Sequence, residues 1–86
     1  AVEIRKAVIA LAQSRAQVEA AHKAAELSRQ SLAAEETKLL EGSSIFYEVI
    51  RRQRDLRASQ FAEVQALTAY AKAMVERDRA MGLLSD

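Results

Sequence analysis

A single interruption divides this sequence, and it limits the possible folds more than any other feature. Glycine appears first at Gly42 and again at Gly82, and proline is absent. Two unbroken segments of about 40 residues therefore flank the short sequence Glu41-Gly42-Ser43-Ser44. Both segments are rich in residues that favour helix, and neither contains a β-branched run typical of a strand. The sequence predicts helices at about residues 2–40 and 45–82, joined by a turn at residues 41–44.

The turn sequence predicts how the first helix ends and how the second begins. Gly42 suits the left-handed position after a helix C-terminus, because glycine has no Cβ. Ser43 or Ser44 can cap the second helix through its hydroxyl, and Glu48 then lies where the helix dipole favours an anion. A connection this short forces the helices antiparallel, and each is about 60 Å long at 1.5 Å per residue. The predicted fold class is all-α: one long antiparallel two-helix coiled-coil hairpin, a single rod-shaped domain over residues 1–86.

Heptad spacing indicates which faces of the two helices meet. In the first helix, apolar residues recur every seven positions, at Ile4, Leu11, Val18, Ala25, Leu32 and Leu39. The companion positions are mostly small: Ala7, Ser14, Ala21, Ser28 and Glu35. Apolar positions alternating with small ones allow a partner helix to approach closely. In the second helix we expect a less regular seam at Phe46, Val49, Gln53, Leu56, Gln60, Val64, Leu67, Ala71, Met74 and Met81.

Each helix also carries a second apolar stripe outside the predicted seam. On the first helix it contains Val2, Ile9, Ala16, Ala20, Ala24, Leu27 and Ala34; on the second it contains Ile45, Ala66, Ala69, Ala73 and Ala80. Two stripes per helix favour neighbours on both sides, as in a sheet or barrel of helices, although alanine is common wherever helix is favoured. Because burial of apolar surface is favourable, we expect the isolated chain to self-associate.

Composition excludes several classes of function. The net charge of +1 gives no electrostatic reason to expect nucleic acid as a partner. Cysteine is absent, which excludes disulfides and thiolate chemistry. The longest apolar run, residues 7–12, is far shorter than the roughly 18 residues that span a bilayer, and no signal peptide is visible. The helical pattern is already present at Val2 and the first residue is Ala1, so we interpret the chain as a piece of a larger protein.

One spacing could indicate metal chemistry. Glu19 and His22 form a Glu-x-x-His pair, the spacing found in di-iron helical bundles, and a hairpin folded at Gly42 would place Glu63 roughly opposite His22. The predicted seam passes beside this motif, so Glu19 would point away from it and His22 would only flank it. No serine or aspartate motif surrounds His22 to support nucleophilic catalysis. We therefore expect a solvated His22, no metal, no other cofactor and no enzymatic activity.

The segment around the turn combines charge with apolar residues. A basic cluster, Arg51-Arg52-Gln53-Arg54, follows the turn, and at i+4 spacing Glu48 can pair with Arg52, and Arg51 with Asp55. A salt-bridged helix face is the simpler interpretation, and a docking or pore-lining surface is the functional one. Apolar residues crowd the expected tip: Leu39, Leu40, Ile45, Phe46 and Tyr47. An exposed apolar tip can meet a partner.

Residues 38–56 resemble the second-repeat hairpin motif of TolC-like outer-membrane efflux proteins. That motif contains, in this order, a basic and an aromatic residue, a glycine, a serine, an Asp-Val-Leu triplet, an Ala-Gln pair and a leucine. It is matched here by Gly42, Ser44, Val49, Gln53 and Leu56, while Glu48 replaces the acid conservatively. Residues 3–7, 69–70 and 80–84 are similar to the start and end of the family's hairpin helices, so the resemblance covers nearly the whole chain.

The resemblance implies a function that composition alone does not. The family forms homotrimers whose β-strands build an outer-membrane barrel and whose helices build a periplasmic tunnel, an α-helical barrel. Its hairpin turns form the aperture and meet a periplasmic adaptor, through which an inner-membrane pump drives export. This chain would be one hairpin of the tunnel, in the periplasmic part of a Gram-negative outer-membrane protein and without the strands. The residues expected to dock the adaptor or line the aperture are Leu40, Glu41, Gly42, Ser43, Ser44, Ile45, Glu48 and Arg51.

Departures from the motif occur where gating would be determined. Leu39 stands where some members have a gate tyrosine, and Ser44 where some have a gate arginine. Arg51 occupies the place of a second acidic residue of an anionic ring, and Glu41 replaces a small apolar residue. A Tyr–Arg gate lock and cation selectivity are therefore not implied. The alternative function is a free-standing coiled-coil interaction module, either an adaptor-type hairpin or a dimeric four-helix bundle.

Overall fold

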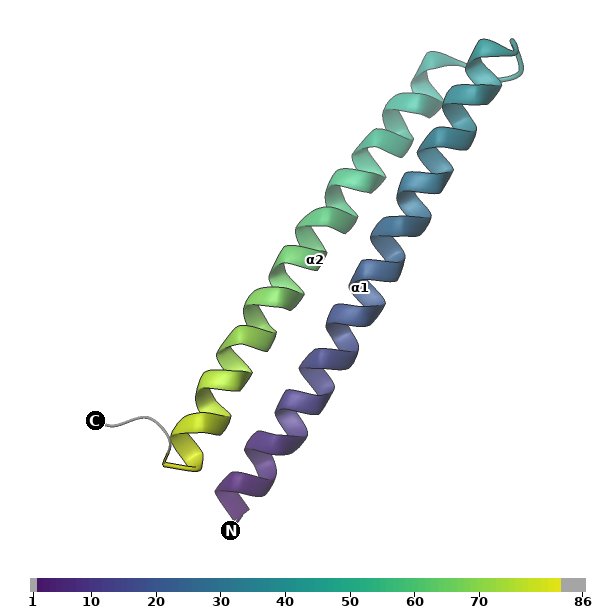
Figure 1. Cartoon of the computed structure of the whole chain (residues 1–86). Coiled ribbons are helices and arrows are strands. Elements are labelled where there is room, and N and C mark those ends of the chain that lie inside the picture. Colours follow the sequence, from purple (N-terminus) through teal and green to yellow (C-terminus); the bar gives the residue numbers. More distant parts are fainter. Residues whose placement is uncertain (1, 83–86) are drawn as a thin grey trace.

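The computed structural model describes residues 2–82, which form two helices joined by a short turn (Figure 1). Helix α1 spans Val2–Leu40 and helix α2 spans Phe46–Ala80. They lie side by side and antiparallel along their whole length, and the described residues contain no strand. The rod measures 61 × 20 × 13 Å, in agreement with the length expected from helical rise. The predicted all-α hairpin is confirmed, with α2 one residue later at its start and two residues shorter at its end than expected.

The seam of α1 follows the predicted heptad. Ala25 is fully buried, and two of the companion positions, Ser14 and Glu35, are also buried. The remaining heptad residues are half-buried, apart from Ile4 near the N-terminus, which is exposed. Small side chains between larger ones bring the helix axes together, since ridges of one helix can enter the grooves of the other.

Two contacts between the helices define their register. The hydroxyl groups of Ser28 and Ser59 lie 2.8 Å apart, and Glu35 Oε1 lies 3.6 Å from Arg52 Nε. Moving seven residues toward the turn on α1 thus moves seven residues toward the turn on α2. The same register, continued away from the turn, places three pairs of small residues opposite one another: Ala21 and Ala66, Ser14 and Ala73, Ala7 and Ala80.

The seam predicted for α2 is wrong over most of its length. Val49, Gln53, Leu56 and Met74 are buried or half-buried, but the other predicted seam residues are exposed: Phe46, Gln60, Val64, Leu67, Ala71 and Met81. Their place is taken by half-buried residues facing α1, which include three alanines assigned to the second stripe: Ser59, Glu63, Ala66, Tyr70, Ala73, Arg77 and Ala80. The physical reason is the close approach of the axes, because small residues of α1 pack best against small residues of α2. The larger apolar side chains of α2 are consequently left outside.

Candidate functional site at the hairpin turn

Gly42 closes α1 in the conformation that the sequence predicts. Its φ of +79° lies in the left-handed region. The backbone N–H of Ser43 donates to the carbonyl of Lys38 at 2.8 Å, and that of Gly42 donates to the carbonyl of Leu39 at 3.1 Å. These two bonds form a Schellman motif, which satisfies carbonyls that the helix end leaves free. The chain therefore reverses direction immediately after α1.

The two serines do not cap α2, contrary to the sequence-based prediction. Ile45 occupies the N-cap position in an extended conformation and provides no side-chain cap. The Ser43 hydroxyl donates instead to the carbonyl of Lys38 at 3.2 Å, and the Ser44 hydroxyl donates to Glu35 Oε2. The buried carboxylate of Glu35 requires a hydrogen-bond donor, and Ser44 supplies it.

Glu35 lies at the centre of a polar cluster that the sequence did not reveal as a site. It comes from α1, accepts the hydroxyl of Ser44 from the turn and faces Arg52 of α2. The hydrogen bond from Ser44 lowers the pKa of Glu35, burial acts in the opposite direction, and the positive charges of Lys38 and Arg52 add to the lowering. The cluster links all three parts of the hairpin end. The sequence did contain an indication of this cluster. Glu35 occupies a seam position of the α1 heptad, so its side chain had to face a residue of α2.

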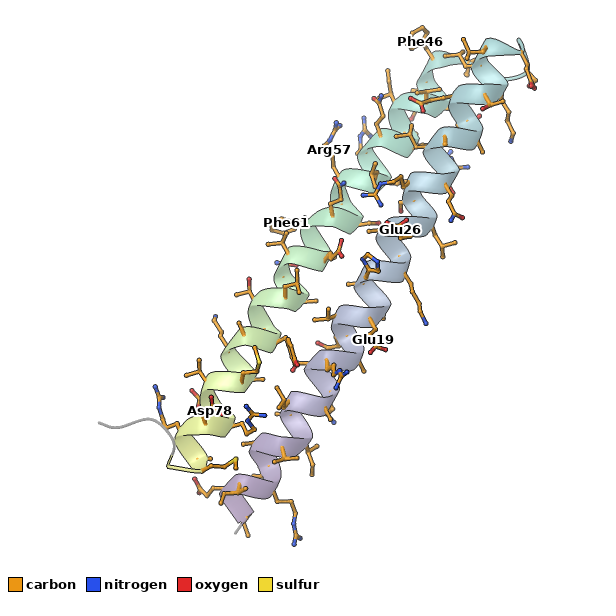
Figure 2. The ribbon with its side chains drawn as sticks, viewed as in Figure 1. Glu19, Glu26, Phe46, Arg57, Phe61 and Asp78 are labelled. Atoms are coloured by element: carbon orange, nitrogen blue, oxygen red, sulfur yellow. The ribbon has the colours of Figure 1, made fainter. Side chains whose placement is uncertain are left out.

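Apolar side chains stand out from the turn. Leu40, Ile45 and Phe46 are 89%, 61% and 71% exposed, and Phe46 projects from the end of the rod (Figure 2). Beside them lies an open groove of about 450 Å³, lined by Glu36, Leu39, Leu40, Phe46, Val49 and Gln53. The predicted apolar tip is thus an exposed surface with a shallow depression on one side.

The charged residues after the turn pair differently from the prediction. Glu48 lies 3.6 Å from Arg51, and Asp55 lies 3.9 Å from Arg52, so both pairs have i,i+3 spacing instead of i,i+4. Arg52 is turned toward Glu35 in the seam, which removes it from the reach of Glu48. Glu41 is exposed beside Gly42. The structure therefore brings Glu48 and Arg51 together and leaves Glu41 separate from them.

His22 contacts Glu63 across the hairpin, as the antiparallel register predicts. His22 Nδ1 lies 2.7 Å from Glu63 Oε2, with the His22 side chain 61% exposed. Glu19 lies on the side of α1 away from α2 (Figure 2). No group of three or more His, Cys, Asp or Glu side chains that could hold a metal occurs within residues 2–82. The interhelical contact is therefore a surface pair between two side chains.

Comparison with known proteins reveals no relative of this chain. No protein-family model, curated protein or solved structure matches the chain.

Within residues 2–82, neither α1 nor α2 has a stretch that is apolar over the length needed to span a lipid bilayer.

Proposed function

We propose that this chain is one helical hairpin of the periplasmic tunnel of a TolC-like outer-membrane efflux channel. In this proposal its turn docks a periplasmic adaptor and lines the aperture. The full-length protein is a homotrimer anchored in the outer membrane by β-strands, and an inner-membrane pump acts on it through the adaptor. The motif of residues 38–56 is the basis of the family assignment.

The observation that carries the proposal is the large apolar surface that the hairpin leaves uncovered. Phe61, Val64 and Leu67 on α2 are exposed, and Phe61 lies on the edge of α2 away from α1 (Figure 2). On α1, Ile9 and Leu27 are exposed as well. A free two-helix rod would gain by making these faces polar, whereas a hairpin with helices on either side needs them apolar.

The turn has features suited to docking and to an aperture. The exposed side chains of Leu40, Ile45 and Phe46 and the adjacent groove offer apolar surface to a partner helix. Gly42 has open space at the position where a side chain would be, which allows another backbone to approach. Glu48 and Arg51 form a neutral pair, so the turn would not present a purely anionic ring.

The proposal is tested first in the gene that encodes the chain. A signal peptide, segments of alternating strand pattern and a second copy of the hairpin motif are expected around this sequence. An open reading frame that contains none of these refutes the channel and supports the free-standing interaction module.

A functional test uses the full-length protein in a bacterium that lacks its own efflux duct. Gly42→Leu is expected to reduce drug efflux, because the new side chain blocks the approach of an adaptor helix, and Glu48→Lys is expected to alter ion conductance. Lys23→Gln, an exposed change in the middle of α1, is the matched control. Normal transport by both turn variants with intact trimer assembly, together with loss of transport on mid-shaft substitution, would place the function away from the turn.

A further inference from the structure

Helix α2 carries a second heptad beside the one that packs against α1, and most of its residues are exposed. Its positions alternate by four and three residues along the entire helix: Phe46, Ile50, Gln53, Arg57, Gln60, Val64, Leu67, Ala71, Met74, Asp78 and Met81. We call this set the outer stripe. It is shifted by one residue from the seam positions Val49 and Arg52, which rotates it by about 100° around the helix. Figure 2 shows Arg57 on the edge of α2 that points away from α1, and Phe46 at the turn end of the helix.

Most of the outer stripe is apolar and open to water. Phe46, Ile50, Val64, Leu67 and Met81 are all exposed. The spacing is that of an a/d seam, which packs knobs into holes of another helix with the same spacing. A polar surface helix would place charged residues at these positions. The stripe therefore has the pattern of a second helix–helix interface.

The charges within the stripe favour a particular partner. Arg57 forms no salt bridge within the described part of the chain. Asp78 accepts two hydrogen bonds from Arg77, both at Oδ1, so Oδ2 is available. The two charged residues lie at nearly equal sequence distance on either side of Leu67. An antiparallel copy of the same stripe would place Arg57 of one chain opposite Asp78 of the other, twice.

We propose that two copies of this chain pair through their outer stripes, antiparallel, about a two-fold axis at Leu67. In this register Leu67 meets Leu67 of the second copy, Val64 meets Ala71, and Gln60 meets Met74. A parallel pair would instead bring Arg57 against Arg57 and Asp78 against Asp78, and opposed like charges disfavour it. The pairing buries the exposed side chains of Val64, Leu67 and Met81, while Phe46 and Ile50 lie beyond the overlap.

The size of the interface fits a weak dimer. In this register nine positions overlap, from Gln53 to Met81, and this stretch of 29 residues is about 43 Å long on a helix about 10 Å wide. It would bury about 430 Å² per copy, or about 870 Å² in total, which is below the roughly 1,000 Å² of a stable interface and within the range of weak association. Association is therefore expected to depend on concentration. The inference concerns the purified chain and does not rest on the channel proposal, so failure of either one leaves the other standing.

Cysteine cross-linking tests the position of the axis. The sequence has no native cysteine, so Leu67→Cys introduces a single thiol. At the two-fold axis it is expected to form a disulfide-linked dimer rapidly under mild oxidation. Gln65→Cys, exposed two residues away on the same helix and pointing to a different side, is the matched control and is expected to react slowly. Equal rates for the two variants would overturn the proposal.

Charge exchange tests the antiparallel register by sedimentation equilibrium. Arg57→Asp places the new aspartate of each copy opposite Asp78 of the other. The dimer is expected to weaken about tenfold, because two ion pairs are lost and repulsion between like charges replaces them. Asp78→Arg alone is expected to weaken it similarly, and the double variant to restore it. A wild-type chain that stays monomeric at high concentration, or a double variant as weak as the single ones, would contradict the proposed pairing.

Discussion

Replacement of Gly42 gives the most direct measure of how the turn is held. The left-handed φ of +79° is strained for any residue with a Cβ, at about 1–2 kcal/mol. Nothing lies within 4 Å of a Cβ built at this position, so Gly42→Ala adds no steric clash. Alanine also reduces the entropy of the unfolded chain, which offsets about 0.4–1 kcal/mol of the strain. The expected net loss of unfolding free energy is therefore about 1 kcal/mol.

A graded series separates backbone strain from other effects of substitution. Gly42→Asn should cost less than Gly42→Ala, because asparagine tolerates the left-handed region, and Gly42→Val should cost more, because β-branched residues are outliers there. Gly82→Ala is the internal comparison, since Gly82 also has a positive φ and open space around its Cβ position. Its effect should be smaller, because the end of α2 can fray without separating the two helices.

The assay is urea unfolding followed by far-ultraviolet circular dichroism at one fixed protein concentration. With an m-value of about 1.5 kcal/mol per M, a loss of 1 kcal/mol lowers the midpoint by about 0.7 M. Gly42→Ala equal to the wild type, or Gly42→Asn as damaging as Gly42→Val, would refute the left-handed turn. A loss well above about 2 kcal/mol would contradict the open space at this position. Light scattering should accompany each variant, because a weakened turn can also become a continuous helix that pairs with another chain.

Three further substitutions test the seam and the polar cluster. Glu35→Gln should lower the free energy of unfolding at neutral pH. Because the pKa of Glu35 is lowered in the folded state, its carboxylate contributes its full stabilisation above the ordinary pKa of 4.5 and loses it as the pH falls and the group is protonated, so the difference from the wild type should then diminish. Urea midpoints at two pH values check this, with the exposed Glu36→Gln as control. Ser44→Ala should cause part of the loss of unfolding free energy that Glu35→Gln causes at neutral pH. In a double-mutant cycle, the loss for the double variant should not exceed the sum of the two single losses, because both remove the same hydrogen bond. Ala25→Leu should destabilise the hairpin by about 1–3 kcal/mol through overpacking, whereas Ala24→Leu on the exposed side should have little effect in thermal unfolding.

Much of the hairpin could be predicted because the residues that determine its helices and turn are close to one another in the sequence. The position of Gly42, the absence of other breaks before Gly82 and the heptad of α1 each depend on neighbouring residues in the sequence. Ser44 was misassigned for a reason that is not local. Its hydroxyl could cap α2 or satisfy a buried acid, and only the approach of α1 to the turn decides between the two. The outcome depends on Glu35, nine residues earlier in the chain.

The seam of α2 could not be chosen from its own sequence, since α2 offers two heptads that differ by one residue. The outer stripe contains more large apolar residues, and hydrophobicity alone therefore selects it. The observed seam instead places Ser59 and Ala66 opposite Ser28 and Ala21 of α1, where small side chains on both helices allow the axes to approach. Close packing along the full rod gains dispersion contacts that a bulkier seam would lose at the small positions of α1. The choice between the stripes is thus made by the partner helix, and it leaves the more apolar face of α2 available for a second interaction.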